Sequence, residues 1–391
     1  MPESTGSGRT STTWRVGARQ PVDYEVVIAR GLLEPQNREL AQACGADGVA
    51  TRCLVLIDDA VDVLYGEALR AYFDAWSIDT SWTVINGSEE SKSIAQVVAA
   101  TEAMSSMGIL RRAEKVIAIG GGAVLDVAGM AASLYRRGVP YVRVPTTLIG
   151  QVDAGVGVKT GVNYGTHKNR LGSYYAPEKA LIDPEFLRTV PQRHINNGMA
   201  EIAKMALIKD RELFELLESV AGEVSAATLA DAGPHLLEIM TRAIGGMLDE
   251  LEPNLWEHEL ERVVDYGHTF SPSLELRADP PLLHGEAVAV DMAVCVAVAH
   301  NRGLLGHEGA DRALALLQAL GLPTTDPVFT TELLAESLQD AVRHRDGAQR
   351  VPLTSGLGSA VFVNDIDDGE LAAALEFVRA AAGTGLVRAS R

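Results

Sequence analysis

Residues 116–126 read Val-Ile-Ala-Ile-Gly-Gly-Gly-Ala-Val-Leu-Asp. A short apolar, β-branched run followed by glycines and a helical pattern predicts a buried strand that turns into a helix. Glycines at such a turn let the backbone approach a pyrophosphate, and the helix N-terminus offers free N–H groups and the positive end of its dipole. Because Leu125 stands where the last glycine of Gly-x-Gly-x-x-Gly would be, the stretch alone leaves both a nucleotide site and a tight turn open.

The same alternation of strand and helix continues on both sides of this stretch. Strands are predicted at 24–29, 54–57, 82–85, 116–119 and 141–144, and helices near 35–44, 60–76, 91–107 and 123–136. This order is typical of an α/β domain with a mainly parallel sheet and helices on both faces. The glycine-rich segment 151–175 interrupts it, and we expect a β-hairpin and loops that line a site.

From about residue 186 the pattern changes to long amphipathic helices with little strand signal. Helices are predicted near 199–219, 226–250, 286–302, 309–320, 331–344 and 369–382. The sequence therefore predicts a disordered leader over 1–20, an α/β N-terminal domain over 21–185 and a C-terminal all-helical domain over 186–391. A cleft between two such domains is a favoured place for a ligand.

The composition argues against several classes of function. The 391 residues carry 34 Lys and Arg against 52 Asp and Glu, and the net charge of −18 repels phosphate backbones and anionic lipid headgroups. We therefore expect no nucleic-acid partner and no membrane association, and no run reaches the roughly 18 apolar residues of a membrane span. Three widely spaced cysteines make no disulfide framework, and the N-terminus lacks a signal-peptide pattern. These features predict a cytoplasmic protein.

Two motifs in the C-terminal half contain residue types that commonly bind metal ions. Glu201 and Lys204 are three residues apart on a predicted helix, so they project from one face, and an isolated pair of this kind is usually a solvated ion pair. His268 and His284 each lie beside a glycine near the start of a helix. One glutamate and two histidines are a usual ligand set for catalytic zinc, although the compact His-Glu-x-x-His spacing is lacking. A metal site and an ion pair both remain open.

A basic cluster lies in the glycine-rich segment of this acidic chain. Its members are Asp153, Lys159, Lys168, Asn169 and Arg170. Lysine supplies a point charge and asparagine adds directional hydrogen bonds, so the cluster suits a phosphate or a polyhydroxylated anion. A basic surface loop is the alternative.

Together these motifs resemble the sugar phosphate cyclase family, whose best-known members are the dehydroquinate synthases. The resemblance covers about residues 24–365 and is carried by Gly120-Gly121-Gly122 with Asp126, Pro145-Thr146-Thr147, Val152-Asp153, Lys159-Thr160-Gly161-Val162-Asn163, Lys168-Asn169, Ala200-Glu201, Gly267-His268-Thr269-Phe270 and His284-Gly285-Glu286. It implies a two-domain fold, NAD bound to the N-terminal domain, a zinc or cobalt ion in the cleft, a small-molecule sugar phosphate substrate and a homodimer.

The resemblance also implies roles for individual residues. The metal ligands are Glu201, His268 and His284. The NAD contacts are Asp58, Glu89, Lys92, Gly120, Gly121, Gly122, Asp126, Thr146 and Thr147. The catalytic residues are Asp153, Lys159, Lys204, Asp265 and His344, and the substrate contacts are Lys168, Asn169, Arg137, Arg242 and Leu251. Of these, Arg137 resembles an arginine that reaches the phosphate across a dimer interface.

Departures from the dehydroquinate synthase pattern bear on the substrate. Residues 152–159 read Val-Asp-Ala-Gly-Val-Gly-Val-Lys in place of Val-Asp-Ser-Ser-Val-Gly-Gly-Lys, and Pro272 replaces a second histidine. Glu261 stands where an arginine is expected, and His344 where a lysine is. Fewer cations and the added Asp265 suit a neutral polyol better than the carboxylate of the shikimate-pathway substrate.

The combination of Leu251, Asp265 and His344 with residues 163–175 resembles the 2-epi-5-epi-valiolone synthases of this family. The resemblance implies cyclisation of sedoheptulose 7-phosphate with release of phosphate. The implied steps are transient oxidation by NAD, phosphate elimination, re-reduction, ring opening and aldol closure. The alternatives are a 2-epi-valiolone synthase or another cyclase of the family, a metal-dependent polyol dehydrogenase, and a non-catalytic relative.

Overall fold

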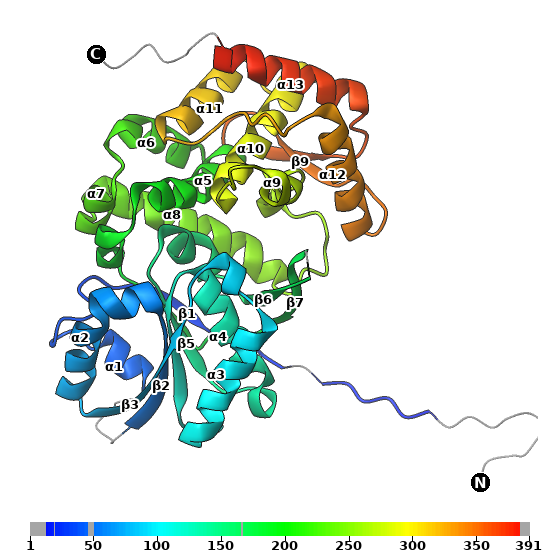
Figure 1. The fold of residues 1–391 in the computed structure, drawn as a ribbon. Helices are drawn as coiled ribbons and strands as arrows, with labels where there is room; N and C mark the ends of the chain where they lie inside the picture. The colour runs from blue at the N-terminus through cyan, green and yellow to red at the C-terminus, as the bar shows by residue number, and fades with distance from the viewer. Residues whose placement is uncertain (1–12, 19, 46–50, 166, 384–391) are drawn as a thin grey trace, which may run out of the picture.

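A computed structural model of the chain describes residues 13–18, 20–45, 51–165 and 167–383. Figure 1 shows two parts, a sheet flanked by helices and a larger assembly of helices stacked on it. Residues 1–12 and 19 of the expected disordered leader lie outside the described residues. Within the described residues no helix has the length and apolar character to cross a membrane.

The N-terminal part is built on a six-stranded parallel sheet with the order β1-β8-β5-β4-β2-β3. Its strands are β1 (Glu25–Ile28), β2 (Thr51–Asp58), β3 (Ile78–Ile85), β4 (Lys115–Gly120), β5 (Tyr141–Pro145) and β8 (Lys179–Ile182). The five predicted strands and the parallel sheet are confirmed. The additional strand β8 has only four residues and follows the glycine-rich segment, where no alternation signals it.

Helices cover both faces of this sheet because successive strand side chains point to opposite sides. The helices are α1 (Glu39–Ala43), α2 (Asp59–Ala75), α3 (Ile94–Met107) and α4 (Gly122–Leu134). Val55 and Ile57 of β2 pack with α1 and α2, whereas Leu54 and Leu56 pack with α3 and α4. Strands buried on both faces read as continuous apolar runs, which is the pattern of residues 116–119.

The C-terminal part is helical, as predicted. Its helices are α5 (Gln192–Ile208), α6 (Arg211–Val220), α7 (Ala226–Asp231), α8 (Pro234–Leu251), α9 (Ser271–Arg277), α10 (His284–Asn301), α11 (His307–Ala319), α12 (Thr331–His344) and α13 (Asp368–Gly383). Two runs expected to be single helices are each broken in two. Asp210 starts α6 by accepting a hydrogen bond from Leu213 N, and Pro234 opens α8 at a position where it cannot continue a helix.

Two antiparallel hairpins complete the fold. The hairpin expected in the glycine-rich segment is formed by β6 (Lys159–Tyr164) and β7 (His167–Tyr174). The second, β9 (Val351–Thr354) with β10 (Ala360–Val363), lies in the part predicted to be all-helical. The prediction missed it because β9 is buried at all four positions and so lacks a polar–apolar alternation.

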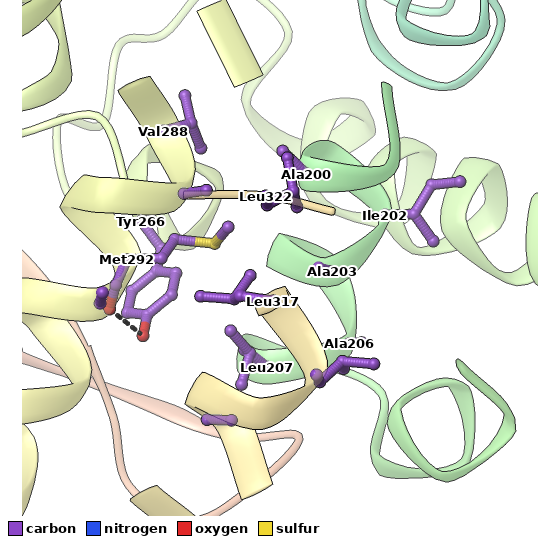
Figure 2. Packing of buried hydrophobic residues seen from close by; sticks show 14 of the residues in the cluster. Ala200, Ile202, Ala203, Ala206, Leu207, Tyr266, Val288, Met292, Leu317 and Leu322 are labelled. Atoms are coloured by element: carbon purple, nitrogen blue, oxygen red, sulfur yellow. Dashed lines mark hydrogen bonds between the residues drawn. The ribbon is translucent and has the colours of Figure 1, made fainter. Parts of the chain in front are cut away.

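The core of the C-terminal part forms around α10, whose residues are buried nearly all round. Figure 2 shows Ala200, Ala203 and Leu207 of α5 in this core near Met292 of α10. The Tyr266 ring is fully buried there, and its hydroxyl donates a hydrogen bond to Met292 O at 3.5 Å. This packing fixes α5 against α10, the two helices that carry the residues described next.

Candidate active site

Three metal-ligand side chains from distant parts of the chain converge at one point. Glu201 lies on α5, His268 precedes α9 and His284 opens α10, and their ligand atoms all lie within 4.8 Å of one another. Glu201 Oε1 is 3.2 Å from His284 Nε2 and 3.7 Å from His268 Nε2. The structure thus brings together the three residues predicted as metal ligands.

Hydrogen bonds orient both imidazoles for a cation. His268 Nδ1 lies 3.0 Å from Tyr266 O, and His284 Nδ1 lies 2.9 Å from Glu275 Oε1. Because these acceptors take the Nδ1 protons, the Nε2 atoms are the ring nitrogens that face the cluster, and they lie 3.3 Å apart. Both oxygens of Glu201 are buried beside them. Two imidazole nitrogens that converge with a buried carboxylate fit a divalent ion.

The charges at this cluster are strongly coupled. Burial disfavours the charge of Glu201, but Lys204, whose Nζ lies 2.5 Å away, and the two histidines hold the pKa of that carboxyl well below its usual range. Burial also opposes the charge of His284, yet Glu201 and Glu275 raise the pKa of that imidazole to about 10. A metal ion must therefore displace a proton from His284 when it binds.

The glycines beside the two histidines are required by close packing. Gly267 has a φ of +74°, and a Cβ there would lie 2.8 Å from Met292 Cγ. A Cβ on Gly285 would lie 2.0 Å from Asn197 O of α5. The same contact is fastened by a hydrogen bond from Gly285 N to Asn197 Oδ1 at 2.5 Å. These close approaches place both histidines next to Glu201.

Glu275 of α9 is a site residue that the sequence analysis missed. One of its oxygens holds His284 and the other lies 2.5 Å from Lys168 Nζ on β7, so it connects the metal cluster to a predicted substrate residue. Its sequence signal is weak, because it is one of two carboxylates, with Asp279, between the two histidines.

The residues predicted to bind NAD gather at the carboxyl edge of the sheet. The chain reverses direction across the sheet between β2 and β4, and ligands of parallel sheets bind at such switch points. Asp58 ends β2, glycines 120–122 lead from β4 into α4, and Thr146 and Thr147 follow β5. Thr146 N donates to Gly120 O at 3.0 Å. A Cβ on Gly120 would lie 3.0 Å from Asp58 Cβ, so the strand ends come close only without that side chain.

A buried lysine joins the NAD residues to the β6–β7 hairpin. Lys92 Nζ lies 2.5 Å from Asp126 Oδ2 on α4 and donates to Asn169 Oδ1 at 2.7 Å. Asn163 Nδ2 donates to Glu89 Oε1 at 3.0 Å, and Asn169 N donates to Asn163 Oδ1. Four predicted residues, Glu89, Lys92, Asp126 and Asn169, therefore belong to one network.

A second residue missed by the sequence analysis, Arg143 of β5, holds the glycine-rich segment. Its side chain is fully buried and donates to Gly157 O at 2.5 Å, Lys159 O at 3.0 Å and Ala154 O at 3.3 Å. An arginine within an apolar strand pattern is the signal that could have revealed it. These bonds fix the course of the backbone between Asp153 and Lys159.

The turn that carries Asp153 packs near the N-terminus of α4, and its carboxylate acts electrostatically on Lys204 of the metal-ligand cluster. A Cβ on Gly122 would lie 3.3 Å from Ala154 Cβ, so the N-terminus of α4 touches the turn that carries Asp153. Burial opposes the charge of Lys204, but Glu201 and then Asp153 raise the pKa of that ammonium. Asp153, Lys204 and Glu201 therefore form a charged row between the two predicted ligand sites.

Two arginines surround Asp265 in the structure. Arg262, next to Glu261, turns inward to pair with Asp265 and Glu257, and Arg345 Nη2 lies 3.2 Å from Asp265 Oδ2. Burial disfavours the charge of Asp265, but the two arginines hold the pKa of that carboxyl below its usual range. Since each arginine is paired with an acid, the cluster remains close to neutral.

Lys159 borders this cluster and pairs with Glu257. Burial and then repulsion from Arg262 lower the pKa of Lys159 to about 8. The side chain is nevertheless 56 % exposed, so its dehydration is incomplete. Lys159 is thus a lysine that exchanges protons near neutral pH.

Other predicted residues lie apart from the cluster. His344, the last residue of α12, is exposed, and its neighbour Arg345 points inward in its place. Arg137 follows the far end of α4, whose 13 residues span about 20 Å, so it lies far from the glycine turn at the start of that helix. Leu251 lies against the glycine-rich segment, because a Cβ on Gly157 would contact its Cδ1 at 3.4 Å. Arg242 is occupied by three carboxylates, those of Asp210, Glu212 and Glu238.

Family models match most of the chain. The model of the 3-dehydroquinate synthase N-terminal domain matches residues 82–197, and that of the C-terminal domain matches 198–343. The chain belongs to the 3-dehydroquinate synthase family. Within this family it is 50% identical over 377 residues to a 2-epi-5-epi-valiolone synthase of Actinomyces sp., covering 95% of this chain and 98% of the relative. It is 49% identical over 383 residues to another from an Actinoplanes species, covering 96% of each.

A solved structure of the same family agrees in fold. It is ValA, a 2-epi-5-epi-valiolone synthase from Streptomyces hygroscopicus subsp. jinggangensis 5008 with NAD+ and Zn2+ bound. The TM-score is 0.88 at 47% identity, over 94% of this chain and 99% of ValA.

Proposed function

We propose that this chain is a 2-epi-5-epi-valiolone synthase, a phosphate-eliminating cyclase that acts on sedoheptulose 7-phosphate with NAD and a zinc or cobalt ion. The observation that carries the proposal is the convergence of Glu201, His268 and His284 at one point, with Lys204 paired to Glu201. It is supported by 50% identity to a relative of that name over nearly the whole of both chains.

The residues of the site fit a divalent ion and NAD. Glu201, His268 and His284 would hold the divalent ion, and the carboxyl edge of the sheet would hold NAD. The ion supplies Lewis acidity toward sugar hydroxyls, and NAD accepts and returns a hydride.

The two lysines of the site suit different tasks. Lys204 stays charged beside Glu201 and Asp153, so it stabilises developing negative charge on substrate oxygens. Lys159, with a pKa of about 8, donates and recovers a proton near neutral pH. Lys168 and Asn169 supply a cation and an amide for the phosphoryl group. The paired cluster at Asp265 offers hydrogen bonds to a neutral polyol end without a free positive charge.

The proposal includes an assembly and a location. A homodimer supplies the second chain that Arg137 needs in order to reach a site. The three cysteines are free and buried, in keeping with a reducing cytoplasm.

The direct test is incubation of the purified protein with sedoheptulose 7-phosphate and a trace of NAD. A cyclase releases inorganic phosphate and forms a cyclitol without lasting absorbance from NADH, and NMR of the product fixes its stereochemistry. Accumulation of NADH without phosphate would identify a polyol dehydrogenase instead. Turnover of only the carboxylated substrate of dehydroquinate synthases would overturn the assignment of the pocket.

A further inference from the structure

Glu275 is a buried carboxylate to which the proposed reaction gives no task. Its side chain is only 6 % exposed, and both oxygens are engaged. Oε1 accepts from His284 Nδ1 at 2.9 Å, and Oε2 lies 2.5 Å from Lys168 Nζ. The carboxylate therefore lies between an imidazole and an ammonium, one on each oxygen.

The two partners of Glu275 belong to different parts of the molecule. His284 opens α10 in the helical part, whereas Lys168 lies on β7 of the glycine-rich hairpin. Lys168 is 34 % exposed, and its ammonium has three N–H donors, so it can contact an anion while it is paired with Glu275. One carboxylate therefore connects a residue of the metal cluster with a residue of the proposed phosphate site.

We propose that Glu275 is a positioning residue that couples the metal end of the site to the phosphate end, an inference that rests on the proposed function. A carboxylate that accepts the Nδ1 proton of a ligating histidine fixes its tautomer and makes Nε2 a stronger donor to the metal. Lys168 withdraws part of that negative charge. When an anion or a substitution neutralises Lys168, Glu275 gives more of its charge to His284 and the ion is held more tightly.

This coupling acts in both directions. If neutralising Lys168 strengthens binding of the ion, then the bound ion must strengthen binding of a phosphoryl group by the same factor. The phosphate of a substrate would then be held best by the metal-loaded enzyme.

The test measures the dissociation constant of Zn2+ by competition with a chromogenic chelator and needs no turnover. Glu275→Gln keeps the shape of the side chain but removes its charge, and it should weaken zinc binding about 10- to 100-fold. Lys168→Met should bind zinc at least as tightly as the wild type, and in a Glu275→Gln background it should have a smaller effect. Glu336→Gln is the matched control, because it breaks the ion pair of Glu336 on α12 with Arg277 on α9 and changes no candidate ligand.

The outcomes separate this inference from the proposed function. A wild-type chain that binds no zinc overturns both. Tight wild-type binding with no change in Glu275→Gln overturns the coupling alone, as does a loss in Lys168→Met equal to that in Glu275→Gln. If circular dichroism shows that Glu275→Gln is misfolded, the charged but shorter Glu275→Asp replaces it and should give an intermediate affinity. Wild-type affinity in that variant would contradict the proposal.

Discussion

Replacement of Gly285 by alanine should damage the site without touching a ligand. The new Cβ would lie 2.0 Å from Asn197 O, whereas real Cβ contacts are essentially never below 3.0 Å, so α10 and α5 must move apart by about 1 Å. His284 precedes this glycine on α10 and Glu201 lies on α5, with 3.2 Å between His284 Nε2 and Glu201 Oε1. A displacement of this size is comparable to the tolerance of a metal site, and an error of about 1 Å can cost 100-fold in rate.

The assay combines zinc affinity, phosphate release and thermal unfolding of Gly285→Ala. We expect zinc affinity and turnover to fall about 100-fold and the free energy of unfolding to fall by about 1–3 kcal/mol. Gly245→Ala is the matched control, since nothing lies within 4 Å of a Cβ at that position of α8. It should leave the site intact and stabilise the helix by about 0.5–1 kcal/mol. If Gly285→Ala bound zinc and turned over like the control, the claim that this contact positions His284 would be refuted.

Three further predictions concern the charged groups of the site. Turnover should fall as pH rises through about 8, because Lys159 loses its proton there. Arg262→Gln should move this alkaline limb to higher pH by removing a repulsive charge, and an unmoved limb would exclude Lys159 as the titrating group. Lys92→Met leaves Asp126 buried without its partner and should lower the free energy of unfolding in urea by roughly 3 kcal/mol. An unchanged urea midpoint would mean that water or another cation replaces the lysine. Treatment with a strong chelator should abolish turnover and lower the melting temperature, and added Zn2+ or Co2+ should restore both. Full activity after exhaustive metal removal would rule out a role for the ion.

The architecture was largely readable from the sequence because its signals are local. A continuous apolar run such as 116–119 can satisfy its backbone only as a buried strand, and the glycines that follow mark the turn into α4. The helix breaks before α6 and α8 were less visible, because the apolar period of the sequence continues across Asp210 and Pro234.

The site was only partly readable, because its completion depends on contacts between distant segments. Glu201, His268 and His284 could be named as chemical types, but no spacing rule places Glu275 behind His284 or Arg143 beneath the glycine-rich segment. At residues 344–345 the side chain that points inward is decided by the phase at the end of α12, which the helical pattern does not resolve. The sequence likewise does not predict that Arg262 points inward, because this residue follows a loop of irregular backbone.

The position of α10 has a consequence for when the metal-ligand cluster forms. This helix is enclosed by α5, α9, α11 and α13, the last of which is near the C-terminus. α13 is made after all three candidate ligand residues, so α10 gains its full cover only when this later helix packs onto it. We therefore expect the cluster of Glu201, His268 and His284 to reach its final geometry after α13 has docked.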